Sequence, residues 1–378
     1  MADRGPGVGT ERHVAYFLRC LDLLPYIYTS NDLNRITLAY FCIVGLDLLH
    51  ALQDVPLEKK EAWKDWIYRC QAEGGGFRGS PQVEGLGRRY DPGHLPSTYF
   101  ALAALVSLRD DLTRVDWEGT LHLIRRLQRK DGSFAPFVME TVDGQGEELG
   151  GEVDMRFTYC ASAVRYILRG NDCKVEDVKV DSAVDYVKSS INYDGGIGQG
   201  PGCESHAGLT YCGVAALSLL GRVDALSNLR QTIRFLTSLQ NQVNAPPTED
   251  ADAASDDEDE YDPGGGFCGR HNKMTDTCYS FWVSGSLSLL PSTSNPPPMD
   301  LIDKEANRKY LLQHTQHKIG GFGKNAGDPP DVLHSCLGLA SLAVQGEERL
   351  QGLDGALCVA EGAREFLATL RTGHATDK

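Results

Sequence analysis

The chain has 378 residues, of which 41% are hydrophobic and 24% charged, a composition typical of globular proteins rather than disordered or fibrous ones. Its 52 acidic and 37 basic residues give a net charge of −15, which argues against a broad basic face for nucleic acid. The 11 cysteines include no CxxC pair, which argues against a zinc ribbon and against a disulfide framework. The N-terminus lacks the apolar core of a signal peptide, and no uncharged apolar run approaches the roughly 20 residues of a membrane span. We therefore expect a soluble, cytoplasmic protein.

The main organising signal is an internal repeat. A glycine-rich turn recurs at intervals of roughly 55 to 70 residues. The turns are Gly74–Phe77, Asp131–Phe134, Asp194–Ile197, Gly264–Phe267 and Gly320–Gly323. Six apolar segments rich in small residues accompany them, in chain order from Ile36, Thr98, Thr158, Thr210, Cys278 and His334. The first of these segments has no glycine turn before it.

The six segments are apolar nearly all round, which is typical of helices buried on both sides. Amphipathic segments lie between them, such as Thr120–Arg129 and Val180–Ser190, and predict an outer layer. No stretch alternates convincingly as a β-strand. The predicted fold class is all-α, an α6-α6 barrel with inner and outer rings of helices around a central apolar cavity. We expect residues 1–378 to form this single domain.

Two segments interrupt the repeat. Nine acidic residues lie between Glu249 and Asp262, and the segment Asn244–Asp262 has too few apolar groups to pack. It predicts a disordered acidic insertion on the surface, with a partner-docking role as the alternative. Thr141–Glu152, a shorter acidic and glycine-rich stretch, predicts a second insertion.

The most informative stretch for chemistry runs from Gly266 to Trp282. Asp276 and Cys278 are two residues apart and do not share a helix face, but they can converge at a helix N-terminus, where Thr275 or Asp276 is a plausible cap. His334 starts the next buried helix, which a barrel brings to the same end of the cavity. Asp, Cys and His would leave one open position, the pattern of a catalytic zinc site. Capping and core roles are the alternative for these three residues.

Cationic and hydroxyl side chains flank the same region. Arg270, Lys273 and Tyr279 indicate an anion pocket, for which phosphate or diphosphate is the natural guest. His206 also precedes a buried helix. A solvated loop end is the alternative for the two cations, and a structural role for His206.

The motifs GFCGRHNKMTDTCYSFW, QGPGCESHAGLTYCG, VDMRFTYCAS and GGFGKNAGDPPDVLH together resemble the β subunits of protein prenyltransferases. The resemblance covers nearly the whole chain, with the motifs in the family's order. It implies an α6-α6 barrel and one zinc ion held by Asp276, Cys278 and His334. It also implies that diphosphate binds to His206, Arg270, Lys273 and Tyr279.

The resemblance further implies a lipid channel and a peptide site. The channel residues are Thr37, Arg156, Tyr159, Cys212, Trp282 and Leu337, and the peptide contacts are His94, Pro96, Arg156 and Phe157. A substrate thiol is deprotonated at zinc and attacks C1 of an isoprenoid diphosphate, while the cationic residues stabilise the leaving group.

Two positions discriminate among the family's farnesyltransferases, type I geranylgeranyltransferases and Rab geranylgeranyltransferases. Thr37 stands where a farnesyl enzyme has a tryptophan, which leaves depth for a fourth isoprene unit. Lys324 stands where magnesium-using members carry an aspartate, so its ammonium can neutralise diphosphate without magnesium. Both favour the type I enzyme, which modifies the cysteine of a C-terminal CaaX motif, often with Leu at X. Leu337 and Pro96 depart from the type I pattern.

The resemblance also implies partners: an α subunit that wraps the barrel and adds a lysine to the diphosphate site, geranylgeranyl diphosphate, and CaaX proteins such as Rho-family GTPases. A terpene cyclase, which shares the barrel, would need a DxDD motif that the sequence lacks. A non-enzymatic barrel that serves as a binding module is the other alternative.

Overall fold

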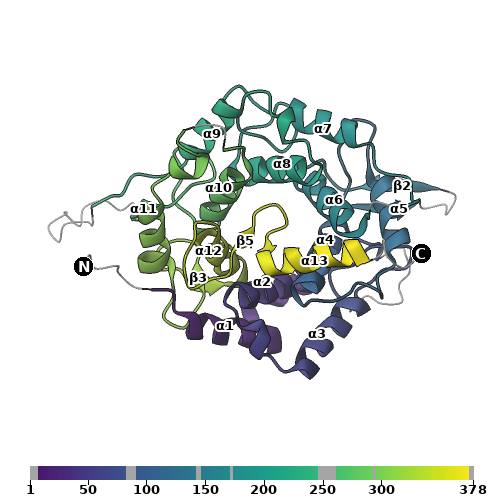
Figure 1. Ribbon diagram of the computed structural model, residues 1–378, viewed down its shortest axis with the longest axis horizontal. Helices are drawn as coiled ribbons and strands as arrows, with labels where there is room; N and C mark the ends of the chain where they lie inside the picture. The colour runs from purple at the N-terminus through teal and green to yellow at the C-terminus, as the bar shows by residue number, and fades with distance from the viewer. Residues whose placement is uncertain are drawn as a thin grey trace.

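The computed structural model describes residues 7–81, 91–141, 146–170, 173–245, 261–292 and 295–373. Within these ranges six helices form an inner ring (Figure 1). They are α2 (Arg35–Leu48), α4 (Leu95–Ser107), α6 (Met155–Leu168), α8 (Ala207–Leu219), α10 (Thr277–Leu289) and α12 (Val332–Val344). Each packs on the next, and α12 packs back on α2, so the ring is closed.

A second set of helices surrounds the ring. It comprises α1 (Thr10–Asp22), α3 (Leu57–Arg69), α5 (Trp117–Leu127), α7 (Val180–Ser189), α9 (Leu229–Thr237) and α11 (Lys304–Lys309), which continues as a π-helical turn, η6 (Tyr310–Thr315). Six inner helices inside an outer set of helices confirm the predicted all-α barrel of inner and outer rings. The inner helices begin one to three residues before the apolar segments read from the sequence.

Each glycine-rich turn follows an outer helix, or η6 in the last repeat, and packs against the next outer helix of the ring. At Gly132 the φ angle is +90°, and a Cβ would lie 2.0 Å from the backbone oxygen of Ser182 in α7. Gly320 has φ of +91° and packs in the same way against Arg12 in α1. A side chain would therefore be strained and would separate the helices. Because the last turn packs on the first helix, the repeat closes on itself.

The loop after each turn reaches the N-terminus of the preceding inner helix. The amide of Leu95 donates to the Pro136 carbonyl at 2.7 Å, and the amide of Thr277 donates to the Lys324 carbonyl at 2.9 Å. The sixth inner helix has a different partner, since the Val332 amide donates to the Tyr28 hydroxyl at 2.9 Å. These bonds gather the inner-helix N-termini and the loops at one end of the barrel, which we call the mouth.

Short antiparallel strands, which the sequence did not predict, complete the fold. They pair as β1 (Phe137–Glu140) with β2 (Glu147–Gly150), β3 (Phe322–Gly323) with β4 (Pro330–Asp331), and β5 (Leu353–Asp354) with β6 (Val359–Ala360). The expectation of no strands was wrong for these short pairs, because strands of two or four residues are too short to show an alternating pattern. The β5–β6 hairpin lies inside the ring, and α13 (Glu361–Gly373) follows it (Figure 1). Short 3-10 turns are η1 (Tyr26–Asn34), η2 (Leu52–Asp54), η4 (Val223–Ala225) and η5 (Pro298–Asp300).

The two predicted insertions are described only in part. In the acidic segment 244–262, residues 246–260 lie outside the described residues, but its ends meet: Asn244 Nδ2 donates to the Asp262 carbonyl at 2.8 Å. Residues 142–145 of the second insertion also lie outside, between β1 and β2. Among the described residues, no helix is both long and apolar enough to cross a bilayer.

Candidate metal centre and barrel cavity

Asp276 and Cys278 meet at the N-terminus of α10. Asp276 is the N-cap, with extended backbone angles, and its Oδ1 accepts a hydrogen bond from the Cys278 amide at 2.8 Å. This change from extended to helical backbone turns two side chains that are two residues apart toward one point. Asp276, Cys278 and His334 bring their ligand atoms within 4.8 Å of one another, as the sequence predicted.

His334 is oriented by a carboxylate that the sequence analysis did not single out. Asp331 is the N-cap of α12: its Oδ1 accepts from the His334 amide at 2.9 Å, and its Oδ2 lies 2.5 Å from His334 Nδ1. The other ring nitrogen, Nε2, lies 3.2 Å from Asp276 Oδ1. A carboxylate at Nδ1 that leaves Nε2 for a metal is the usual outer support of a histidine ligand.

Electrostatics in this cluster favour a cation. Burial works to lower the pKa of His334, but the hydrogen bonds that its ring donates to the carboxylates of Asp276 and Asp331 outweigh it and raise the pKa to about 9. Burial, followed by the Asp276 charge, raises the pKa of the Cys278 thiol well above its usual range. The Asp276 carboxyl and the Cys278 thiol therefore share a buried cluster. A buried acidic group carries its charge readily only beside a positive partner, so the cluster favours a bound cation.

His206 and Tyr279 form a second pair at the mouth. The Gly208 amide donates to His206 Nδ1 at 3.1 Å, so the proton of the neutral ring is on Nε2, 3.0 Å from the Tyr279 hydroxyl. Burial and then the Arg270 charge lower the pKa of His206, and burial raises the pKa of Tyr279. The imidazole is therefore neutral, and the phenol keeps its proton as a hydrogen-bond donor.

The three predicted cations lie on exposed loops of the mouth rather than in the cavity wall. Arg270 Nη1 donates to Glu204 Oε2 at 2.8 Å, so an incoming anion would compete with that carboxylate. Lys273 and Lys324 are exposed. The Lys324 carbonyl accepts from the Thr277 amide, which places the backbone of Lys324 beside the residue that joins Asp276 to Cys278.

A cavity of about 530 Å³ occupies the barrel and is mostly apolar. All six residues predicted for the lipid channel line it: Thr37, Arg156, Tyr159, Cys212, Trp282 and Leu337. Of the predicted peptide contacts, Pro96, Arg156 and Phe157 also line the cavity, whereas His94 is the N-cap of α4 with its ring 5.7 Å from that of Phe137. His206 lines the cavity as well, so the mouth pair opens into it.

Sequence reasoning missed several residues of this site. Asp154, an N-cap that lines the cavity, accepts from Arg156 Nε at 2.8 Å and Nη2 at 2.9 Å and so fixes the guanidinium. Asp331 supports His334 as described. Both precede an inner helix directly, and an acidic residue at an N-cap is the signal that could have found them. Cys358, which also lines the cavity, follows the last repeat and carried no such signal.

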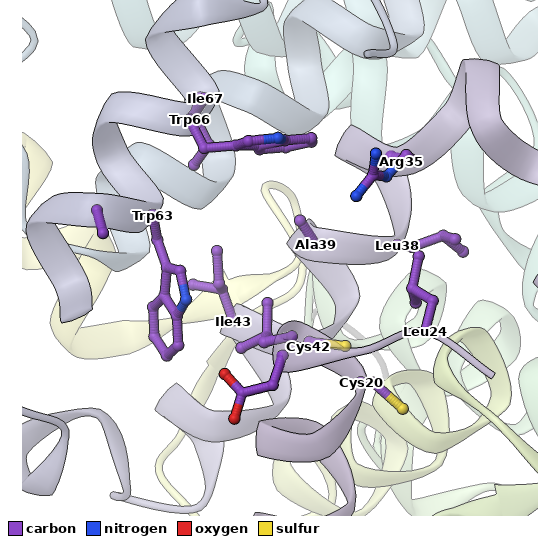
Figure 2. A pocket seen from close by; sticks show the side chains of 13 residues that line it. Cys20, Leu24, Arg35, Leu38, Ala39, Cys42, Ile43, Trp63, Trp66 and Ile67 are labelled. Atoms are coloured by element: carbon purple, nitrogen blue, oxygen red, sulfur yellow. The ribbon is translucent and has the colours of Figure 1, made fainter. Parts of the chain in front are cut away.

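A second cavity, of about 280 Å³, lies outside the ring between α1, α2 and α3 (Figure 2). Its lining includes Trp63 and Trp66 from α3, Cys20 from α1 and Cys42 from α2. None of the residues predicted for zinc, diphosphate, lipid or peptide lines it within the described part of the chain. The candidate site is therefore the cavity inside the barrel together with the cluster at its mouth.

Comparisons with known proteins extend over nearly the whole chain. Residues 8–359 match the model of the prenyltransferase alpha-alpha toroid domain. The chain is 36% identical to the geranylgeranyl transferase type-1 subunit beta of Arabidopsis thaliana, over 91% of this chain and 86% of that protein. The protein of the same name from Dictyostelium discoideum is 31% identical over 90% of this chain and 91% of its own length. A solved structure of Candida albicans protein geranylgeranyltransferase-I complexed with GGPP has a TM-score of 0.84 and 28% identity, with 97% of this chain and 99% of that chain covered.

Proposed function

Because this chain belongs to the family of protein prenyltransferase β subunits, we propose that it is the catalytic β subunit of a type I protein geranylgeranyltransferase. It transfers a geranylgeranyl group from its diphosphate to the cysteine of a C-terminal CaaX motif. The observation that carries this proposal is the Asp276–Cys278–His334 cluster at the mouth of an apolar cavity. The likeness to transferases over nearly the whole chain favours this function over a terpene cyclase or a binding module.

The donor set of the cluster fits one zinc ion. Carboxylate oxygen, thiolate sulfur and imidazole nitrogen are the ligands that zinc takes in proteins, and three of them leave a position for substrate. Zinc, when bound, supplies the positive charge that favours a substrate thiolate at neutral pH. The charges of Asp276 and Cys278 balance that of the ion. Asp331 holds His334 in the orientation that leaves Nε2 for the metal.

The polar groups of the mouth are suited to the leaving diphosphate. His206 donates to the Tyr279 oxygen, which leaves the phenol proton for a phosphate oxygen. Arg270 and Lys273 bring positive charge from the same loop. Groups that strengthen their interaction as charge develops on the leaving group give the largest catalytic benefit.

The choice of the 20-carbon donor is supported by Thr37 in the cavity wall, where a larger residue would shorten the channel. The Lys324 carbonyl accepts from the amide of Thr277, between two of the proposed metal ligands, and the Lys324 side chain carries a charge that can replace magnesium. We therefore propose that the enzyme needs zinc but not magnesium.

A β subunit of this family acts with an α subunit, and we propose an obligate heterodimer in which the α subunit adds a lysine near the diphosphate. Rho-family GTPases and other CaaX proteins are the proposed acceptors. We also propose that residues 1–378 form one domain. A cytoplasmic setting is supported by 11 cysteines that are all unpaired.

The experiment uses the heterodimer with an α subunit and measures transfer to two matched peptides that end in Leu or Ser. Each peptide is offered farnesyl and geranylgeranyl diphosphate. We expect the highest kcat/KM for geranylgeranyl diphosphate with the Leu peptide, and about one zinc per heterodimer. Preference for the farnesyl donor with the Ser peptide would reassign the chain to the farnesyl enzymes.

A pair of cysteine variants tests the metal assignment. Cys278→Ala should lose zinc and turnover while the heterodimer still binds the isoprenoid diphosphate. Cys70→Ala is the matched control, because Cys70 is also buried but lies at the end of the outer helix α3, where its Sγ donates to the Trp66 carbonyl at 3.5 Å. If Cys278→Ala retains zinc and near wild-type turnover, the ligand assignment is wrong.

A further inference from the structure

The outer cavity between α1, α2 and α3 brings two cysteines together. Cys20 lies in the last turn of α1 and Cys42 in the middle of α2, and both line this cavity of about 280 Å³ (Figure 2). Neither residue belongs to the metal cluster or to the lining of the barrel cavity. They are therefore nucleophilic groups that the proposed transfer reaction does not use.

The packing of α1 on α2 sets the two cysteines opposite each other. The end of α1 and the start of α2 line the same cavity, so the two helices run antiparallel. A Cβ on Gly45 of α2 would lie 2.5 Å from the ring of Phe17 in α1, so the helices are in close contact at this pair. Cys20 follows Phe17 by three residues and Cys42 precedes Gly45 by three, and residues three apart share a helix face. One turn along the antiparallel pair, Cys20 therefore faces Cys42.

The surroundings of Cys20 favour its thiolate. A hydrogen bond from the Cys42 thiol, opposed by burial and aided by the Tyr16 hydroxyl and the Arg19 charge, lowers the pKa of Cys20. Burial, followed by the contact with Cys20, raises the pKa of Cys42 well above its usual range. Among the cysteines of the described residues whose pKa is shifted, Cys20 is the one whose pKa is lowered. The C-terminal end of a helix does not favour an anion, so this thiolate depends on its neighbouring side chains.

The cavity gives a small molecule access to the pair. Asp22 and Ala62, which are exposed, line it together with the cysteines, so the cavity opens to solvent. Cys20 is 5% exposed and Cys42 is 1% exposed, so a protein-sized reagent cannot approach them. A water molecule takes up about 30 Å³, and hydrogen peroxide is about twice that size. The cavity therefore has room for hydrogen peroxide beside the two thiols.

We propose that Cys20 and Cys42 are a peroxide-sensitive dithiol that forms a disulfide between α1 and α2. The Cys20 thiolate attacks one oxygen of hydrogen peroxide and the O–O bond breaks. Cys20 becomes a sulfenic acid, and the departing hydroxide takes up the proton that Cys20 released. The Cys42 sulfur then attacks the Cys20 sulfur, the S–O bond breaks, and the hydroxide that leaves takes the Cys42 proton. Two thiols are oxidised and one peroxide is reduced to two waters.

The close helix contact suits such a bond. A disulfide requires Cα atoms within about 7 Å of each other, and packed helix axes are about 8 to 10 Å apart. The contact of Phe17 with Gly45 brings α1 and α2 together one turn from the cysteines. The bond would join α1 to the outer face of α2, because the other face of α2, with Thr37 and Tyr40, lines the barrel cavity. This site therefore lies apart from the substrate cavity.

The test maps the cysteines of the heterodimer after exposure to hydrogen peroxide. Trypsin places Cys20 and Cys42 in separate peptides, 20–35 and 36–59, each with a single cysteine. Mass spectrometry should find these two peptides joined by a disulfide, and dithiothreitol should separate them again. Alkylation at successive times gives the rate at which each thiol is lost.

Cys160 and Cys212 are the matched control pair. They lie on neighbouring inner helices, α6 and α8, and both line the barrel cavity. Burial raises the pKa of both thiols, so they lack the thiolate that starts the reaction. We expect the Cys20 thiol to be lost at least about tenfold faster than either of them, because the thiolate is the reactive form.

Two variants separate the roles of the pair. Cys42→Ala removes the partner thiol, so Cys20 should stop at the sulfenic acid, which dimedone traps. It should also react more slowly, since the hydrogen bond that favours its thiolate is gone. Cys20→Ser removes the attacking thiolate, and Cys42 should then stay reduced. The wild-type map decides the question by itself, even if a variant fails to fold.

Three results would overturn the proposal. The first is a loss of the Cys20 thiol no faster than that of Cys160 and Cys212. The second is a disulfide from Cys20 to a cysteine other than Cys42. The third is a sulfenic acid at Cys20 that accumulates in the wild type as it does in Cys42→Ala. These measurements follow thiols rather than prenyl transfer, so they stand or fall independently of the proposed function.

Discussion

Replacing Asp331 by asparagine tests how this chain orients its metal ligand. Asp331 uses both carboxylate oxygens, one for the His334 amide at 2.9 Å and one for His334 Nδ1 at 2.5 Å. Asparagine has a single oxygen, so it can cap α12 or accept from the imidazole, but not both. Asparagine is a good N-cap, and helix stability should change little.

The magnitude follows from the loss of this outer carboxylate. Removing such a partner typically lowers metal affinity 10- to 100-fold, which corresponds to about 1.4 to 2.7 kcal/mol. The measurement is the zinc dissociation constant of the heterodimer by competition with a chromophoric chelator, beside the thermal midpoint. Asp331→Asn should bind zinc at least about tenfold more weakly while it melts close to wild type.

The matched control is Asp116→Asn. Asp116 caps the outer helix α5, where its Oδ1 accepts from the Gly119 amide at 2.9 Å and its partners include no histidine. This variant should keep wild-type zinc affinity. If Asp331→Asn also binds zinc within twofold of wild type, Asp331 serves only as a helix cap and the reasoning fails.

Three other predictions concern the cavity, the diphosphate and stability. Thr37→Trp should shift preference toward the 15-carbon donor, since excluding one five-carbon unit forfeits about 4 kcal/mol of burial, and an unchanged donor ratio would remove Thr37 from the channel. Wild-type turnover should be nearly flat from zero to millimolar magnesium, whereas Lys324→Asp should lose rate and regain part of it with magnesium; a tenfold magnesium response of the wild type would contradict this role. Burial chiefly lowers the pKa of His13 to about 4, so the unfolded chain binds its proton first and stability should fall, by up to about 3 kcal/mol, as the pH drops from about 6.5 to 4. His13→Gln should flatten that decline in thermal melts, and an equal decline in both proteins would exclude His13.

Much of the candidate site could be predicted because its residues lie at equivalent positions of a repeated helix, which a short stretch of sequence reveals. Asp276 and Cys278 both lie at the N-terminus of one apolar helix. In a barrel of such helices, reactive side chains at a helix N-terminus lie at one end of the barrel. The residues predicted for the lipid channel, such as Tyr159 and Trp282, lie on inner helices for the same reason. Their presence in one cavity follows from helix periodicity and from burial on both sides.

Contacts between segments that are distant in the sequence could not be predicted. The pairing of Arg270 with Glu204 joins two loops, and no local pattern distinguishes it from a free cation at the mouth. Two aspartates at the same helix-capping position also differ in role. The Asp331 side chain contacts His334, a proposed metal ligand, whereas Asp116 accepts from the Gly119 amide of its own helix.

The amino-acid sequence by itself determined the repeat, the all-α barrel and the residue types of the metal cluster, because helix periodicity and glycine turns act over a few neighbours. Only the tertiary structure decided that the β5–β6 hairpin reaches the cavity wall. The hairpin that carries Cys358 lies outside the repeat, and its position depends on hydroxyls of Tyr40, Tyr99 and Tyr211, more than 140 residues away along the chain. Such distances are fixed only when the ring closes, since the closure of the inner helices sets which side chains can reach its centre.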